Sequence, residues 1–172
     1  MRHDDPRNRV GVSDERPQRI GSKPVPFATS VTEPFWSACQ RRELVIPECR
    51  NCAHRFFYPR LLCPRCGEDM FDWITCSGLG TVWSTTTVRM SFWGDAFADD
   101  VPYNVSWVEL DEGIKMVTNV IGVDVAEVRI GMKVRVEFED REEFKIPVFR
   151  PVTDAARTSA DRTTSMVQRS SS

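Results

Sequence analysis

Hydrophobic and polar residues alternate with a period of two in the second half of the chain. From residue 71 onward β-branched and aromatic residues dominate, and between Met132 and Phe138 every hydrophobic residue is followed by a charged one. Alternation of this kind is typical of strands that bury one face. The strands that the pattern predicts are residues 80–88, 103–110, 114–121, 132–139 and 146–149.

The spacing of these strands predicts a small closed barrel. Asp111, Glu112 and Gly113 form an expected hairpin turn, and Pro147 places the last strand at an edge or at the closure of the barrel, because proline cannot donate to a ladder. Five strands within about 75 residues match the scale of the five-stranded OB-fold. A small β-sandwich is the alternative.

The pattern over residues 31–43 is helical instead. Thr32 suits an N-cap, and Phe35, Trp36 and Cys39 then fall on one side of a short helix. A helix of about ten residues is not stable alone in water. Its aromatic face is therefore expected to pack either on this chain or on a partner subunit.

Residues 90–102 form a long connection between two expected strands. Phe92, Trp93 and Phe97 lie in it beside three aspartates. Large aromatic residues in a long connection indicate either a binding surface or a cap over the open end of the barrel.

The composition is that of a globular protein. The chain has 172 residues, of which 41% are hydrophobic and 28% charged. No run of 18 apolar residues occurs, and the first 20 residues lack the apolar segment of a secretion signal. We expect a cytoplasmic protein that does not enter a membrane, with its cysteines reduced.

Charge is distributed unevenly along the chain. Residues 31–150 carry a net charge of −5, with six arginines against two glutamates in residues 41–65 and six acids without a base in residues 91–112. Ordinary solvated surface accounts for such runs equally well. The ends of the chain, residues 1–30 and 153–172, have little to bury and are expected to be disordered tails.

A strand-like stretch, residues 44–47, leads into the strongest motif of the sequence. Cys49 and Cys52 form one C-x-x-C pair, and Cys63 and Cys66 form a second after ten intervening residues. Two such pairs predict a structural zinc site whose four thiolates leave no open position for water. Unliganded cysteines or a redox pair are the alternatives. The arginines expected to offset the charge of this site are Arg50, Arg55, Arg60 and Arg65.

The residues next to the cysteines refine this prediction. Gly67 follows the second pair, as a turn with positive φ favours, whereas Ala53 follows the first. His54 is interpreted as a surface residue, because four thiols already complete the site. Cys39 and Cys76 belong to no motif and are expected to be small buried side chains, since no base is apparent near either.

The order of these parts resembles a known family over about residues 33–150. The motifs that carry the resemblance are Pro34-Phe35-Trp36, Leu44, the two cysteine pairs, Tyr58-Pro59-Arg60, Trp73, Ser77-Gly78, Gly80-Thr81-Val82, Pro102-Tyr103, Val108 to Gly113 and Ile130-Gly131-Met132. Together they resemble the rubredoxin-like zinc ribbon plus OB-fold family long filed as a domain of unknown function. The expected divisions are a helix over 31–43, the zinc ribbon over 44–72 and the OB-fold over 73–152.

The resemblance implies a role in acyl-CoA metabolism. Members of the family resemble partners of thiolase-fold enzymes, such as thiolases, aldolases of steroid side-chain breakdown, hydroxymethylglutaryl-CoA synthase pathway enzymes and polyketide-type acyltransferases. In some relatives the module is fused to, or assembled with, a hot-dog-fold enoyl-CoA hydratase. The resemblance therefore implies a hetero-oligomer that helps to form an acyl-CoA site in lipid, steroid or related metabolism.

Two sets of residues are candidates for contacts in such a complex. Coenzyme A carries phosphates, which favour arginine. The candidate contacts with coenzyme A are Arg55, Tyr58, Arg60 and Arg65. The candidate contacts with a partner are Phe35, Trp36, Phe92, Trp93 and Phe97.

The residues themselves favour one of three functions. The chain shows no serine or cysteine beside a base and no phosphate loop, which favours a non-catalytic accessory subunit. A single-stranded nucleic-acid-binding module is the alternative, disfavoured because residues 73–150 carry few bases and many acids. A free-standing enzyme or rubredoxin-like electron carrier would need an open zinc position or a bound iron.

Overall fold

A computed structural model of the protein describes residues 23–91 and 94–152. The elements are α1 (Glu33–Gln40), β1 (Val45–Cys49), β2 (Phe71–Thr75), β3 (Leu79–Val88), the 3-10 helix η1 (Gly94–Phe97), β4 (Tyr103–Leu110), β5 (Lys115–Thr118), β6 (Lys133–Arg141) and β7 (Phe144–Pro151). The tails expected to be disordered lie outside the described residues, apart from residues 23–30, and so do Phe92 and Trp93. Within the described ranges, no helix is long and apolar enough to cross a membrane.

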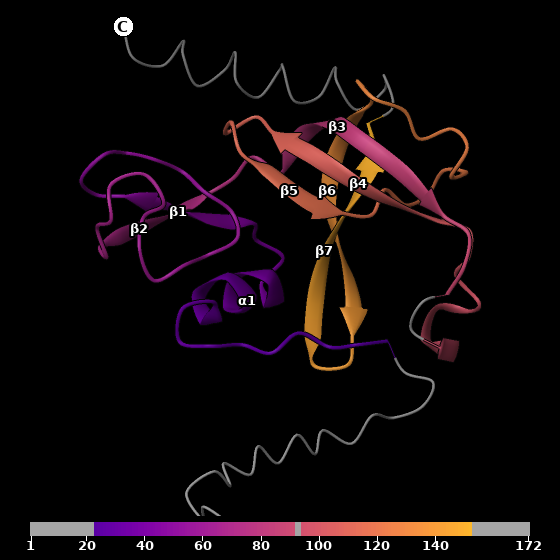
Figure 1. The fold of residues 1–172 in the computed structure, drawn as a ribbon, viewed down its shortest axis with the longest axis horizontal. Coiled ribbons are helices and arrows are strands. Elements are labelled where there is room, and N and C mark those ends of the chain that lie inside the picture. The colour runs from indigo at the N-terminus through magenta and orange to yellow at the C-terminus, as the bar shows by residue number, and fades with distance from the viewer. Residues whose placement is uncertain (1–22, 92–93, 153–172) are drawn as a thin grey trace, which may run out of the picture.

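The five strands from β3 to β7 form one curled antiparallel sheet, in the order β5-β4-β3-β6-β7 (Figure 1). The fold is therefore mainly β, and the curled sheet matches the OB-fold predicted from the alternation. Pro147 lies in β7, at an edge of this sheet, as expected. The two edges approach each other where Val120 forms a parallel bridge with Phe149, which closes one side of the barrel.

A buried polar network supports this closure. The side chain of Asn104 on β4 donates from Nδ2 to the carbonyl of Val120 at 2.6 Å and accepts from the Val120 N–H at 2.8 Å. Ser106 Oγ donates to Asn104 Oδ1 at 2.9 Å, and Thr118 Oγ1 donates to the Pro147 carbonyl at 3.0 Å. Because these groups are buried, the hydrogen bonds offset the cost of removing them from water.

Strands β1 and β2 form a separate antiparallel sheet, the ribbon sheet, in which Pro47 of β1 lies opposite Trp73 of β2. Strand β2 was not among the strands predicted from the alternation, because it has only five residues and none of them is fully buried. The boundary expected between residues 72 and 73 falls inside this strand.

Helix α1 is shorter than the range of 31–43 expected for it. Thr32 precedes the helix as expected, but its hydroxyl does not cap it and instead accepts from the Thr29 N–H at 2.9 Å. Phe35 is 1% exposed, since α1 packs against β1 and β7. Of the two places expected for the aromatic face of the helix, this chain's own core therefore covers the ring of Phe35, one of the candidate partner contacts.

Ribbon, helix and barrel share one hydrophobic core. The core cluster joins Phe35 and Cys39 of α1 and Ile46 of β1 to Val108 and Phe149 of the barrel. Cys76, between β2 and β3, belongs to the same cluster. Cys49, the last residue of β1, is thus positioned by a strand that this core anchors.

Candidate metal centre and partner surface

The four cysteines of the two C-x-x-C pairs come together at one end of the ribbon. The sulfur atoms of Cys49 and Cys66 are 3.5 Å apart, those of Cys52 and Cys63 are 3.7 Å apart, and all four lie within 4.8 Å of one another. A zinc–sulfur bond of about 2.3 Å in a tetrahedron requires sulfur–sulfur distances of about 3.8 Å. The cluster is therefore positioned to bind a metal ion, and its size fits tetrahedral sulfur ligation.

The two pairs adopt equivalent turns. The Ala53 N–H donates to the Cys49 carbonyl at 2.8 Å, and the Gly67 N–H donates to the Cys63 carbonyl at 3.0 Å. Both residues have positive φ, 53° for Ala53 and 78° for Gly67. Ala53, which stands where glycine was expected, thus adopts the left-handed conformation that favours glycine.

The environment of the thiols differs across the cluster. The backbone N–H of Glu68 is the main cause that lowers the pKa of the Cys66 thiol to about 7, while burial raises the pKa of the Cys52 thiol to about 12. A ligand that ionises near neutral pH is suited to a cation. His54 contributes backbone groups to the site. Its carbonyl accepts from the Cys49 N–H, its backbone also hydrogen-bonds the Cys52 thiol, and its ring stacks on Phe56.

Two of the four arginines near the cluster are already paired. Arg50 bonds Asp72 at 2.6 Å and Arg55 bonds Glu48 at 2.7 Å. Among the described residues, Arg60 and Arg65 have no ion pair. These two guanidinium groups therefore remain available to an anionic ligand.

Cys39 and Cys76 are buried, as predicted. Burial is the largest cause that raises the pKa of each thiol to about 12. The carboxylate of Glu112 contributes to the shift at Cys76, a neighbour that the sequence analysis did not identify. Both side chains are therefore protonated thiols at neutral pH.

Several candidate contact residues are engaged within the chain. Trp36 Nε1 donates to the Tyr58 hydroxyl at 3.0 Å, and the Trp36 ring meets Phe144 edge-on at 5.5 Å. The Phe97 ring lies 5.7 Å from the tilted Tyr103 ring and under the ammonium of Lys23, which pairs with Asp100 at 2.8 Å.

Other hydrophobic side chains are also exposed. Leu61, Leu62 and Met70 on the ribbon are each more than half exposed. On the outer face of the barrel, Trp83 is 51% exposed and Trp107 is 44% exposed. Neither tryptophan was among the candidate contact residues, although both lie at outward positions of the alternation, which is a usable signal.

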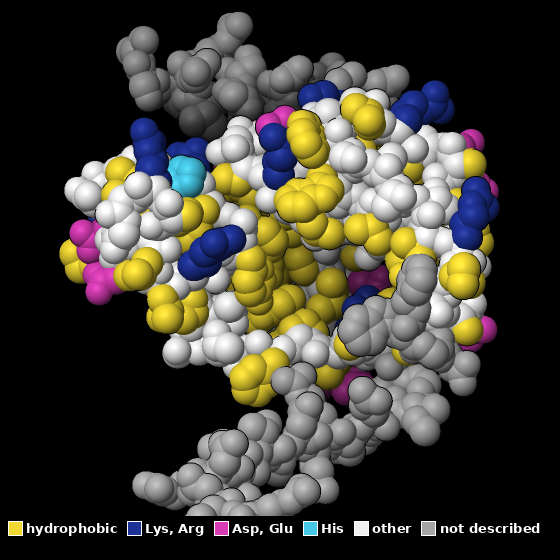
Figure 2. Space-filling view, in the orientation of Figure 1, with side chains coloured by type: hydrophobic (Ala, Val, Ile, Leu, Met, Phe, Trp, Pro, Cys, Tyr) yellow, Lys and Arg dark blue, Asp and Glu magenta, His cyan; other side chains and the backbone are white. Residues whose placement is uncertain are grey.

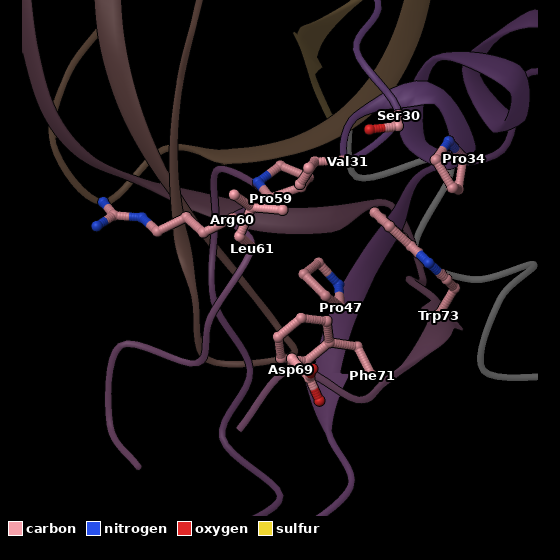
Figure 3. Close-up of a pocket in the computed structure, with 10 residues that line it drawn as sticks. All are labelled: Ser30, Val31, Pro34, Pro47, Pro59, Arg60, Leu61, Asp69, Phe71 and Trp73. Atoms are coloured by element: carbon pink, nitrogen blue, oxygen red, sulfur yellow. The ribbon is translucent and has the colours of Figure 1, made fainter. Parts of the chain in front are cut away.

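Two concave regions accompany these residues. Figure 2 shows a hollow lined by hydrophobic side chains between α1 and the ribbon on one side and the barrel on the other. A separate depression of about 200 Å³ lies on the ribbon (Figure 3). The residues that line the depression are Ser30, Val31, Pro34, Pro47, Pro59, Arg60, Leu61, Asp69, Phe71 and Trp73.

Comparison with known families assigns both halves of the described chain. Residues 36–72 match the ChsH2 rubredoxin-like zinc ribbon domain, and residues 73–139 match the ChsH2 C-terminal OB-fold domain.

Similar proteins include an archaeal and a bacterial one. A DUF35 domain-containing scaffold protein of Methanothermobacter thermautotrophicus is 32% identical over 100 residues, which cover 58% of this chain and 74% of that protein. A probable enoyl-CoA hydratase alpha subunit of Thermomonospora curvata is 32% identical over 141 residues, or 81% of this chain. The chain spans only 42% of the length of that subunit.

A solved structure has the same fold. One chain of the Ltp2-ChsH2(DUF35) aldolase superposes with a TM-score of 0.68 and 32% identity, and the match covers 75% of this chain and 100% of that chain.

Proposed function

Because the chain belongs to the DUF35 family, which joins a rubredoxin-like zinc ribbon to an OB-fold, we propose that it is a non-catalytic subunit of an acyl-CoA enzyme. The partner that we favour is a thiolase-fold thiolase or aldolase. The observation that carries this choice is the match to the full length of one chain of the Ltp2-ChsH2(DUF35) aldolase. A hot-dog-fold hydratase is the second choice, since the similarity to a hydratase alpha subunit covers less than half of that protein.

The cysteine cluster supports a structural role within such a subunit. Four thiolates at tetrahedral spacing favour zinc and leave no coordination position for a substrate. The two other cysteines are protonated, so neither supplies a nucleophile at neutral pH. We therefore assign the chemistry of the complex to the partner enzyme and the zinc to folding of the ribbon.

We assign the contact with coenzyme A to the arginines without ion pairs. Arg60 and Arg65 are exposed, whereas Glu48 engages the guanidinium of Arg55 and Trp36 engages the hydroxyl of Tyr58. Phosphates are bound well by free guanidinium groups. The apolar hollow beside the ribbon supports a contact with the acyl group in the same complex (Figure 2).

The experiment that tests the function is reconstitution. This chain and a candidate thiolase or aldolase from the same source are purified, mixed and separated by size exclusion, and turnover of the acyl-CoA substrate is measured for each part and for the complex. We expect co-elution, no turnover by this chain alone and higher turnover by the complex. Turnover by the isolated chain at ordinary enzymatic rates would overturn the proposal.

The coenzyme A contact is tested in the complex with matched variants. Arg60→Ser and Arg65→Ser should each raise the KM for the acyl-CoA substrate several-fold with little change in kcat, because each removes a binding contact. Arg50→Ser is the control, since Asp72 already pairs with that guanidinium. Equal effects of all three substitutions would indicate a general effect of charge.

A further inference from the structure

Strand β2 is an open edge of the ribbon sheet. It pairs with β1, and the register from Val45 opposite Thr75 to Cys49 opposite Phe71 contains no bulge. Among the described residues, no other strand pairs with β2. Proteins usually protect such edges with proline, lysine or bulges. Residues 71–75 contain none of these and carry one charge, Asp72, which pairs with Arg50.

Hydrogen bonds at the two ends of the ribbon show which residues face this edge. The Cys76 N–H donates to the Leu44 carbonyl, and the Arg50 N–H donates to the Met70 carbonyl. Antiparallel strands alternate between hydrogen-bonded and non-hydrogen-bonded pairs. The even-numbered residues of β2 therefore bond to β1, and Phe71, Trp73 and Thr75 direct their N–H and C=O groups away from it.

The same strand forms a wall of the depression on the ribbon. Phe71 and Trp73 point into it from β2, with Pro47 between them on β1 (Figure 3). The other wall comes from the segment before α1 and from the loop that contains Pro59 and Leu61. The open backbone groups and the apolar depression thus belong to the same two residues of β2.

The size of the depression selects its occupant. Its volume is about 200 Å³. Sites for drug-sized ligands have about 300–1,000 Å³, whereas a cavity of about 150 Å³ binds benzene. A single aromatic or branched aliphatic side chain therefore fits, and a whole coenzyme A does not. Arg60 lines the depression with its stem while its guanidinium points away (Figure 3).

Charge at the rim adds a second requirement. Asp69 lies at the edge of the depression, immediately before β2, and it has no ion pair among the described residues. A lysine or arginine beside the apolar side chain of the occupant would pair with this carboxylate.

We propose that the edge of β2 accepts an extended segment of the partner enzyme, which adds a third strand to the ribbon and places one apolar side chain in the adjacent depression. Pairing of this type gains affinity from main-chain hydrogen bonds and specificity from pockets for alternate side chains. The occupant is a segment with an aromatic or branched aliphatic residue next to a lysine or arginine. This inference rests on the proposed function, because it requires a partner enzyme.

The test uses two substitutions that leave the core intact. Ser30→Trp fills the depression from its exposed rim, with Ser30→Ala as its control. Thr75→Pro removes an outward N–H without breaking a bond to β1, with Thr75→Val as its control. Trp107→Thr on the outer face of the barrel is a control for exposed tryptophan elsewhere. Each is titrated by calorimetry against the purified partner enzyme that binds the wild-type chain.

We expect Ser30→Trp and Thr75→Pro to weaken binding at least about thirtyfold, as loss of a central anchor does, while the three controls stay within about threefold. Amide hydrogen exchange gives a second readout, because the N–H groups of Phe71, Trp73 and Thr75 should gain protection of about tenfold or more on binding.

The outcomes separate the two proposals. Wild-type binding that neither Ser30→Trp nor Thr75→Pro weakens would overturn the β2 site and leave the proposed function standing. No binding of any thiolase, aldolase or hydratase by the wild-type chain would overturn the proposed function and the site with it. Protection of β2 in the chain alone would also overturn the site. If dilution abolished this protection, the occupant of the edge would be a second copy of the chain. If removal of residues 1–22 abolished it, the occupant would be that segment.

Discussion

The side-chain amide of Asn104 forms two hydrogen bonds with the backbone of Val120, one in each direction. It takes the place of a strand residue at the point where the barrel closes. The two bonds require a donor and an acceptor on the same side chain, which an amide has and an ionised acid lacks.

Asn104→Asp should therefore destabilise the protein by about 2–4 kcal/mol, because the Val120 carbonyl loses its donor and a carboxylate is buried beside it. The measurement is urea unfolding at pH 7. Thr86→Ala, an exposed change on β3, is the control and should stay within about 0.5 kcal/mol. An unchanged midpoint for Asn104→Asp would contradict the role given to this amide.

Because the turns at Ala53 and Gly67 are equivalent, exchanging alanine and glycine should change the stability in opposite directions at the two positions. Ala53→Gly should stabilise the ribbon by about 0.5–1 kcal/mol, because a left-handed conformation costs a residue with a side chain about 1 kcal/mol. Gly67→Ala should destabilise it by about 1 kcal/mol through its backbone alone, since no atom lies within 4 Å of an added Cβ. Thermal unfolding of both variants, loaded with zinc, measures the two signs, and equal signs would show that the turns are not equivalent.

Metal analysis of the purified protein should find one zinc per chain and no colour. Removal of the metal, or Cys63→Ser, should unfold the ribbon, because zinc binding contributes on the order of 10 kcal/mol to folding of such sites. Circular dichroism and thiol titration with and without chelator follow this loss. A red preparation that contains iron, or unchanged melting of Cys63→Ser, would show that the site is not structural zinc.

The buried thiols predict a loss of stability at high pH. Burial raises the folded-state pKa of Cys39 from 9.0 to about 12, so the unfolded state releases its proton first as the pH rises. The stability that this group contributes is complete below about pH 9 and falls between about pH 9 and 12, by at most about 1.4 kcal/mol per pH unit.

Cys39→Ala should accordingly flatten the dependence of the unfolding free energy on pH between pH 8.5 and about 10. Ser37→Ala on the exposed side of α1 is the control for a helix substitution. The same slope in Cys39→Ala and wild type would show that Cys39 does not contribute to the pH dependence.

The sequence predicted the parts of the fold whose signals are local. Alternation over residues 132–139 reports one buried face, and the spacing of the cysteine pairs reports a shared ligand site, so the barrel and the metal cluster were both expected. The strand predicted over 114–121 ends at Thr118. Beyond it, the Asn119 side chain donates to a β4 carbonyl, and Val120 forms its bridge with β7.

The parts that the sequence did not predict depend on pairings between distant segments. Strand β2 forms by pairing with β1, where Trp73 lies opposite Pro47. A pairing between distant segments leaves no periodicity in the sequence. The sequence likewise left open whether Phe35 packs on this chain or on a partner, since its covering by α1's neighbours β1 and β7 appears only when the chain is folded.

The shared core of ribbon and barrel bears on how such proteins can be inherited. Ile46 of the ribbon and Phe149 of the last strand belong to one cluster, and the family boundary after residue 72 cuts through β2. A gene fusion that carried the OB-fold alone would expose the apolar surface that α1 and β1 cover. The two segments should therefore be duplicated, fused and lost together, as a single unit of recombination.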